Sequence, residues 1–152
     1  PVEDATMDVA VCAEVLEHLD DDAGAVRQLA RVLRPGGLLV VTVPAGPHRM
    51  DWTDTWAGHR RRYAAPQLTE LLRAGGFVRV DVRGWGFPLT GLYHRHVYAP
   101  MLRRRVDAGR PGLGGGAPRG AARILRMALE LDTPFIGRAP GWFGLLATAR
   151  RA

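Results

Sequence analysis

The sequence predicts an α/β fold built around a parallel sheet. Two short runs rich in apolar and β-branched residues, Thr6–Cys12 and Leu38–Val43, have the length and character of strands covered on both faces. A helical segment separates them, a second one follows, and Phe77–Arg83 then alternates apolar and polar residues as a third strand would. Strands and helices alternating in this order predict parallel strands joined by right-handed crossovers.

The helix between the first two strands has clear start and stop signals. Asp20-Asp21-Asp22 supplies N-cap carboxylates and a charge that favours the positive end of a helix. Four apolar residues at i, i+3, i+4 and i+7 predict one buried stripe: Val26, Leu29, Ala30 and Leu33. Pro35-Gly36-Gly37 is expected to stop this helix, and Glu14–Leu19 predicts a single helical turn before it.

Residues 44–64 predict a long polar loop, and loops of this length in compact domains are usually functional or disordered. Its candidate functional residues are Trp52, Trp56, His59 and the run Arg60-Arg61-Arg62. Pro66 then suits the first turn of a second helix, which Gly75-Gly76 closes. The apolar side of that helix carries Leu68, Leu71 and Leu72.

The pattern weakens after Trp85. Residues 87–105 mix aromatic, histidine and arginine residues, and in a strand His94 and His96 would point to opposite faces and fit no metal spacing. Residues 108–120 are rich in Gly and Pro and are expected to be flexible.

Two more elements are predicted near the end of the chain. Arg119–Leu131 predicts an amphipathic helix, in which Arg126 and Glu130 are spaced to pair on the surface. Trp142–Arg150 predicts a last strand.

The composition excludes several classes of protein. The 152 residues suffice for one domain with its own core, and no apolar run approaches the ~18 residues of a transmembrane helix. Cys12 is the single cysteine, which excludes an intramolecular disulfide and makes a cytoplasmic location the expectation. Serine is absent, which excludes a serine nucleophile within the chain.

The net charge of +6 and the pI of about 10.9 raise the question of a nucleic-acid partner. All 21 basic residues are arginine, and the chain is rich in Ala, Gly and Pro, a composition typical of a GC-rich genome. The charge is also uneven, since Glu3–Asp22 is acidic and the remainder is basic. We therefore favour compositional bias over a dedicated polyanion site and do not expect nucleic acid as the partner.

Three sequence segments resemble segments of a known protein family. The segment Asp8–Leu19 reads DVAVCAEVLEHL, Arg31–Leu39 reads RVLRPGGLL, and Gly58–Tyr63 reads GHRRRY. In this order and spacing they resemble the region around the fourth and fifth strands of class I S-adenosylmethionine (SAM)-dependent methyltransferases, over residues 6–84. The resemblance implies a Rossmann-like methyltransferase sheet that is incomplete here, with strands four to seven and their flanking helices. It also implies a final antiparallel strand beside the fifth.

The resemblance leaves an N-terminal half of the domain missing. The family's Gly-rich loop after strand one and its ribose-binding acidic residue after strand two have no counterpart in this sequence. The glycine-rich segment Gly112–Gly116 is not that loop, because no buried strand precedes it. We expect the chain alone to be inactive and to bind little SAM. The expected regions are a methyltransferase core over 1–84, a variable insert or substrate lid with one helix over 85–140, and the final core strand over 141–152.

Ligands of open α/β sheets bind beyond the carboxyl ends of the strands. The resemblance implies that Cys12, Ala13 and Glu14, at the end of the first strand, run beside the methionine part of SAM. The Cys12 side chain is interpreted as a buried thiol rather than a nucleophile.

Methyl transfer to a hydroxyl needs a positioned acceptor and a base for its proton. His18 and His59 are the candidate catalytic bases, because imidazole titrates near neutral pH.

A divalent metal is a second hypothesis for the same region. Glu14, Glu17 and His18 lie at i, i+3 and i+4 and would share one face of a helix, with His59 as a candidate fourth ligand. Two groups that this segment resembles, the ubiquinone-pathway O-methyltransferases and the small-RNA 2′-O-methyltransferases, use such a Glu-x-x-Glu-His pattern with a metal. Local hydrogen bonding by the same residues is the alternative.

The remaining candidates concern the substrate. The run Arg60-Arg61-Arg62 could bind an anionic group of the substrate or could belong to a solvated loop. The aromatic side chains could line the acceptor pocket or anchor the loop to the core: Trp52, Trp56 and Tyr63. Residues 85–105 are compatible with a substrate lid, a membrane surface or a lipid substrate. The leading hypothesis is SAM-dependent O-methylation of a small molecule. RNA methylation and a non-catalytic, methyltransferase-like interaction module are the alternatives.

Overall fold

The computed structural model describes residues 2–109, 119–137 and 143–152. The chain divides into two compact units, each described below by itself. The first unit comprises Pro1–Gly84 with Gly144–Ala152, and the second comprises Trp85–Phe143.

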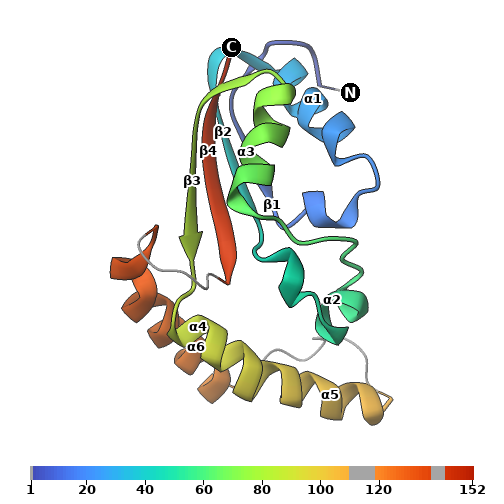
Figure 1. The fold of residues 1–152 in the computed structure, drawn as a ribbon, viewed down its shortest axis with the longest axis vertical. Helices are drawn as coiled ribbons and strands as arrows, with labels where there is room; N and C mark the ends of the chain where they lie inside the picture. The colour runs from blue at the N-terminus through green and yellow to red at the C-terminus, as the bar shows by residue number, and fades with distance from the viewer. Residues whose placement is uncertain (1, 110–118, 138–142) are drawn as a thin grey trace. The chain divides into compact units, whose positions relative to one another are not determined.

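A four-stranded sheet organises the first unit (Figure 1). Its order is β1-β2-β4-β3, with β1 over Met7–Ala13, β2 over Leu33–Pro44, β4 over Gly144–Arg151 and β3 over Phe77–Trp85. The strand β2 runs parallel to β1 and antiparallel to β4. The expected parallel pair and the expected final antiparallel strand are both confirmed, although Trp142, where that strand was predicted to begin, lies outside the described residues.

Two helices pack on one face of this sheet, α1 over Asp22–Val32 and α3 over Ala65–Ala74 (Figure 1). The Asp21 carboxylate caps α1 by accepting a hydrogen bond from the Gly24 N–H at 2.7 Å. Leu33 was predicted to belong to the helix, but it is extended and begins β2. Pro35-Gly36-Gly37, which was expected to stop the helix, lies within β2, and a shift in the register between β1 and β2 accommodates it.

The two faces of the sheet differ in burial. Leu39, Val41 and Val43 of β2 are fully buried on the face that the helices cover. On β1, Val9 is 52% exposed and Val11 is 68% exposed, because neither a helix nor a further strand of the described chain lies over them. The expectation that the first strand is covered on both faces is therefore wrong for this chain.

The segment 44–64 is more ordered than predicted. It contains a short 3-10 turn over Pro47–Arg49 and the helix α2 over Trp52–Ala57. The side chains of Asp51 and Asp54 form a reciprocal capping box at the start of α2. Gly58 ends the helix in the left-handed conformation, which glycine adopts without steric cost.

The described part of the second unit is helical. The helix α4 over Leu89–Tyr93, a π-helical segment over His94–Tyr98 and α5 over Ala99–Asp107 follow one another directly. The strand considered for His94 and His96 is therefore wrong. Most of the Gly/Pro-rich segment predicted to be flexible lies outside the described residues.

The helix α6 spans Arg119–Asp132 and packs on α4. The buried Asp132 carboxylate accepts hydrogen bonds from the N–H groups of Leu89 at 2.9 Å and Thr90 at 2.7 Å, which joins the end of α6 to the start of α4. A short 3-10 turn over Thr133–Phe135 follows. The predicted helix and the predicted Arg126–Glu130 pair, at 3.5 Å, are confirmed. Among the described helices, none combines the length and apolar character needed to cross a bilayer.

We predict that Gly75→Ala destabilises the first unit. A Cβ atom at Gly75 would lie 2.3 Å from Cγ1 of the buried Val26, at the contact between α3 and α1. Overpacking of this kind costs about 1–3 kcal/mol in the free energy of unfolding, measured by chemical denaturation. Gly120→Ala is the matched control, because among the described residues no atom outside its chain neighbours and its own helix backbone lies within 4 Å of that Cβ position. Equal stability of the two variants would contradict the close helix contact.

Candidate functional site

The carboxyl ends of β1 and β2 lie at the same edge of the sheet. Ala13 pairs with Thr42, and the Glu14 N–H donates to the Thr42 carbonyl at 2.9 Å. Ala13 is exposed and small, and Glu14 turns away from the strand with φ +53°. This exposed tip is the place at which the family resemblance implies the methionine part of SAM.

Cys12 is directed away from that exposed tip. Its side chain is buried, with 7% exposure. Burial and then the nearby Glu17 carboxylate raise the pKa of the thiol above its ordinary value. The thiol is therefore protonated at neutral pH, as befits a small buried side chain rather than a nucleophile.

Glu17 is a buried carboxylate whose nearest charge partner among the described residues is His18, with Glu17 Oε1 3.8 Å from the His18 Nε2. It lies in a 3-10 turn over Leu16–His18 and its side chain is fully buried. Among the described residues neither carboxylate oxygen has a hydrogen-bond partner. Burial is the main cause that raises the pKa of Glu17 above its ordinary value. A buried charge of this kind is costly unless something compensates it.

The segment that follows α2 runs back to the 3-10 turn at Leu16–His18, and backbone hydrogen bonds hold it in place. The Tyr63 N–H donates to the Pro44 carbonyl at 2.9 Å, and the Gly46 N–H donates to the Tyr63 carbonyl at 2.9 Å. The Arg60 N–H donates to the Glu17 carbonyl at 2.8 Å, and the Arg60 side chain donates to the His18 carbonyl at 2.9 Å. These bonds bring His59, forty-one positions after His18, beside the 3-10 turn.

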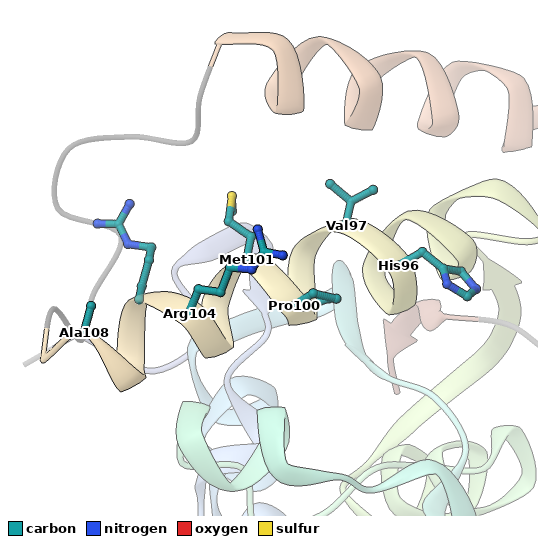
Figure 2. Close-up of a pocket in the computed structure, with 7 residues that line it drawn as sticks. His96, Val97, Pro100, Met101, Arg104 and Ala108 are labelled. Carbon is teal, nitrogen blue, oxygen red and sulfur yellow. The ribbon is translucent and has the colours of Figure 1, made fainter.

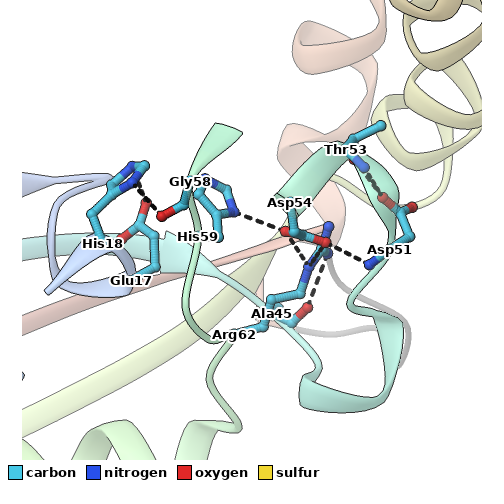
Figure 3. A network of polar contacts seen from close by, with 9 residues as sticks. All are labelled: Glu17, His18, Ala45, Asp51, Thr53, Asp54, Gly58, His59 and Arg62. Atoms are coloured by element: carbon cyan, nitrogen blue, oxygen red, sulfur yellow. Dashed lines mark hydrogen bonds and ion pairs between the residues drawn. The ribbon is translucent and has the colours of Figure 1, made fainter. Parts of the chain in front are cut away.

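His59 is held by a buried ion pair (Figure 3). Its Nδ1 lies 2.8 Å from Oδ1 of Asp54, and the Arg62 Nε donates to both oxygens of Asp54, at 2.8 and 2.9 Å. Burial opposes ionisation of Asp54, but the hydrogen bonds from Arg62, the Asp51 backbone and His59 outweigh it and lower the pKa of the carboxyl. A carboxylate only accepts, so this contact assigns the imidazole proton to Nδ1 and leaves the Nε2 lone pair available.

The two histidines and Glu17 form one cluster. The ring centroids of His18 and His59 are 4.8 Å apart with planes at 79°, and one ligand atom from each of the three residues lies within 4.8 Å of the others. The His18 Nδ1 contacts the Gly58 carbonyl at 3.2 Å, and its Nε2 lies 3.8 Å from Oε1 of Glu17 (Figure 3). The cluster therefore offers a carboxylate and two imidazole nitrogens, a donor set suited to a divalent cation.

Glu14 is not a member of this cluster within the described residues. The predicted set of Glu14, Glu17 and His18 assumed one continuous helix. The chain instead leaves β1 with a positive φ at Glu14 and enters a 3-10 turn at Leu16, so helical spacing does not apply. The hypothesis of His59 as a further member agrees with the geometry.

The three consecutive arginines bind the protein itself. Arg60 pairs with Asp20 at 2.6 Å, and Arg61 pairs with Asp22 at 3.0 Å. Arg62 donates to Asp54, and the Tyr63 hydroxyl donates to Asp22 at 2.7 Å. These contacts favour an anchoring role for the run over recognition of a substrate anion. Tyr63 is likewise fully buried as an anchor, whereas Trp52 and Trp56 are half-buried on α2.

Asp54 is the site residue that the sequence did not reveal. It lies five positions before His59, a spacing that brings no two side chains together on a continuous helix. The contact depends on the left-handed turn at Gly58, which reverses the chain directly after α2. A glycine that ends a helix just before a histidine was the signal available in the sequence.

Comparison with known proteins gives a consistent result. A family model described as "Methyltransferase domain" matches residues 1–82. The chain is 41% identical over 116 residues to a probable S-adenosylmethionine-dependent methyltransferase of Mycolicibacterium smegmatis, covering 71% of this chain and 45% of that protein. It is 29% identical over 101 residues to a ubiquinone biosynthesis O-methyltransferase of Idiomarina loihiensis, covering 57% of this chain and 42% of that protein. The chain thus spans less than half the length of these curated relatives.

Solved structures agree on the fold. A SAM-dependent methyltransferase from Thermotoga maritima superposes with a TM-score of 0.59 at 15% identity, covering 100% of this chain and 59% of that one. At this identity the likeness concerns the fold alone.

We predict that Glu17→Gln stabilises the protein at neutral pH. Because the folded state raises the pKa of Glu17 above its ordinary 4.5, the carboxyl favours folding below that pH, and this contribution is lost as the pH rises. Gln carries no charge to bury, so at neutral pH the variant should gain about 1–3 kcal/mol relative to the wild type, with a smaller gain in acid. Urea unfolding across this range measures both.

Glu14→Gln is the matched control, since Glu14 is an exposed carboxylate close by in the sequence. It should change stability little at any pH. A Glu17→Gln variant that is less stable at neutral pH would show that the Glu17 charge has a stabilising partner.

Proposed function

Because the chain belongs to the methyltransferase-domain family, we propose that it forms the acceptor side of a SAM-dependent enzyme that methylates a hydroxyl of a small molecule. The observation that carries this proposal is the His59 imidazole. It is hydrogen-bonded to the buried Asp54 through Nδ1 and joins Glu17 and His18 in one cluster. The name of the Idiomarina relative, an O-methyltransferase, supports oxygen as the acceptor atom.

The strand tips fit one part of SAM. Ala13 is small and exposed, so a ligand can approach the backbone there, and it adjoins the end of β2 in the register of the sheet. The strand β1 stands at the end of the described sheet, so its outer edge leaves room for further strands to complete the cofactor site. We propose that the rest of that site is contributed outside these residues. SAM would supply a methyl carbon already activated by the sulfonium.

His59 would act as the general base. Its Nε2 lone pair accepts the hydroxyl proton while the acceptor oxygen attacks in line, and positive charge then develops on the ring. Asp54 stabilises that imidazolium through the Nδ1 hydrogen bond, and Arg62 keeps Asp54 ionised. Asp54 is therefore a positioning residue for His59.

A divalent cation is a second candidate for the same cluster. Glu17, His18 and His59 would hold it. The observation that favours it is the fully buried Glu17 carboxylate, which has no hydrogen-bond partner among the described residues. A cation there would compensate the buried charge and polarise an acceptor hydroxyl. In that case His59 serves as a ligand rather than as the base.

RNA is a less favoured acceptor. Outside residues 85–143 the chain has twelve arginines and twelve carboxylates, so the unit that carries the site has no excess positive charge. Binding of a nucleic acid depends on such an excess.

We predict that His59→Gln lowers kcat by about 10²–10⁴-fold in the protein that carries this chain, assayed by transfer of labelled methyl from SAM to phenols and vicinal diols. Asp54→Asn should lower kcat as well, because its amide would face Nδ1 and move the ring proton to Nε2. Histidine ring ¹⁵N spectra would show that tautomer change directly. His48→Gln is the control, since His48 is exposed on another turn. Full activity of His59→Gln, or methylation of nitrogen acceptors alone, would contradict the proposal.

The cation hypothesis has a separate test. If a cation is held, a chelator should abolish activity and Mg²⁺ or Mn²⁺ should raise the Tm of the wild type but not of Glu17→Ala. An active Glu17→Ala variant that is insensitive to the chelator would exclude the cation and leave His59 as the base.

A further inference from the structure

We propose that the second unit, Trp85–Phe143, docks on an anionic lipid surface. The charge of the chain is divided unequally between its two units. Residues 85–143 contain nine arginines and three carboxylates, whereas the remainder contains twelve of each, so the entire net charge of +6 lies in the second unit. A genomic bias towards arginine acts on both units alike, and it does not explain why only one of them leaves its charge unbalanced. A localised positive charge attracts anionic surfaces.

An apolar stripe accompanies this charge. In α6, Ile124 is 51% exposed, Met127 is 48% exposed and Leu131 is 58% exposed, and they recur at i, i+3 and i+7 on one flank of the helix. The adjacent face of the same helix is used for packing, since Ala128 and Asp132, at i+4 and i+8 from Ile124, are buried. Arg123 lies exposed beside the stripe. A helix with an exposed apolar flank bordered by arginine matches the pattern of segments that lie in a membrane interface.

A groove on the neighbouring helical run has the same mixed character (Figure 2). It is lined by His96, Val97, Pro100, Met101, Arg104, Arg105 and Ala108. Figure 2 shows the Val97 and Met101 side chains pointing to the side on which α6 runs. Arginine binds phosphate oxygens in a planar fork, and the apolar lining suits the glycerol and upper acyl part of a lipid. The groove therefore fits a phospholipid headgroup better than a fully hydrated anion.

An anionic lipid surface would bind both the positive charge and the exposed apolar stripe of the second unit. RNA would use the arginines, but the aliphatic side chains of the stripe give it no stacking platform. A neutral apolar surface would use the stripe but would not compensate the net positive charge of the unit.

Vesicle co-sedimentation of the full chain tests the proposal. Vesicles of phosphatidylcholine with a quarter phosphatidylglycerol should bind at least about tenfold more tightly than pure phosphatidylcholine at low salt, and binding should weaken as salt is added. Arg104→Glu with Arg123→Glu should reduce binding by about tenfold or more, and Met127→Gln with Leu131→Gln should also reduce it.

A matched charge control separates a local surface from overall charge. Arg27→Glu with Arg73→Glu changes the net charge by the same amount, but both residues are exposed in the first unit, and binding should fall by less than about twofold. Far-UV circular dichroism verifies that each variant folds.

Four results would overturn the proposal: no vesicle binding, equal binding to neutral vesicles, an equal loss in the control variant, or binding of transfer RNA that depends on the same arginines in the absence of vesicle binding. The assay reads no methyl transfer, so its result is independent of the proposed reaction.

Discussion

The return of the chain after α2 to the end of β2 is the constraint on which the site depends. Tyr63 pairs through its backbone with Pro44 and through its hydroxyl with Asp22, so the residues just before it are placed against the turn that follows β1. That placement brings His59 to Glu17. The arginines of this segment serve the same end, because each one binds a carboxylate of the protein. The sheet provides the edge at which β1 and β2 end, and the anchored segment places the His59 imidazole beside Glu17 and His18.

The site also contains a buried carboxylate, Glu17, whose charge is unfavourable to bury. Glu17 is fully buried without a hydrogen-bond partner in the described chain, a few residues after the exposed end of β1. Asp54 shows the contrasting case, since Arg62 and His59 satisfy it and lower its pKa. Two buried carboxylates whose pKa values are shifted in opposite directions flank one imidazole. Such a pairing is expected where a proton is moved or a cation is bound.

The sequence predicted the regular elements and missed the local turns. Strands and helices of the core followed from apolar periodicity, and even the antiparallel last strand followed from the resemblance. The error at Glu14 arose because a positive φ interrupts the assumed helix, and periodicity carries no signal for a single left-handed residue. Asp54 was missed because its contact with His59 depends on the turn at Gly58 rather than on spacing. The helical run from Leu89 to Asp107 was missed because its buried residues do not form a simple stripe across the π-helical segment.

The central claim is that the edge where β1 and β2 end, together with His59, forms one methyl-transfer site. A crystal structure of the protein that carries this chain, bound to S-adenosylhomocysteine, tests it most directly. The account predicts that the homocysteine part lies along the backbone at Ala13 and that its sulfur faces the side on which His59 and Glu17 lie. A ligand bound at another edge of the sheet, or with its sulfur directed away from His59, would contradict the account.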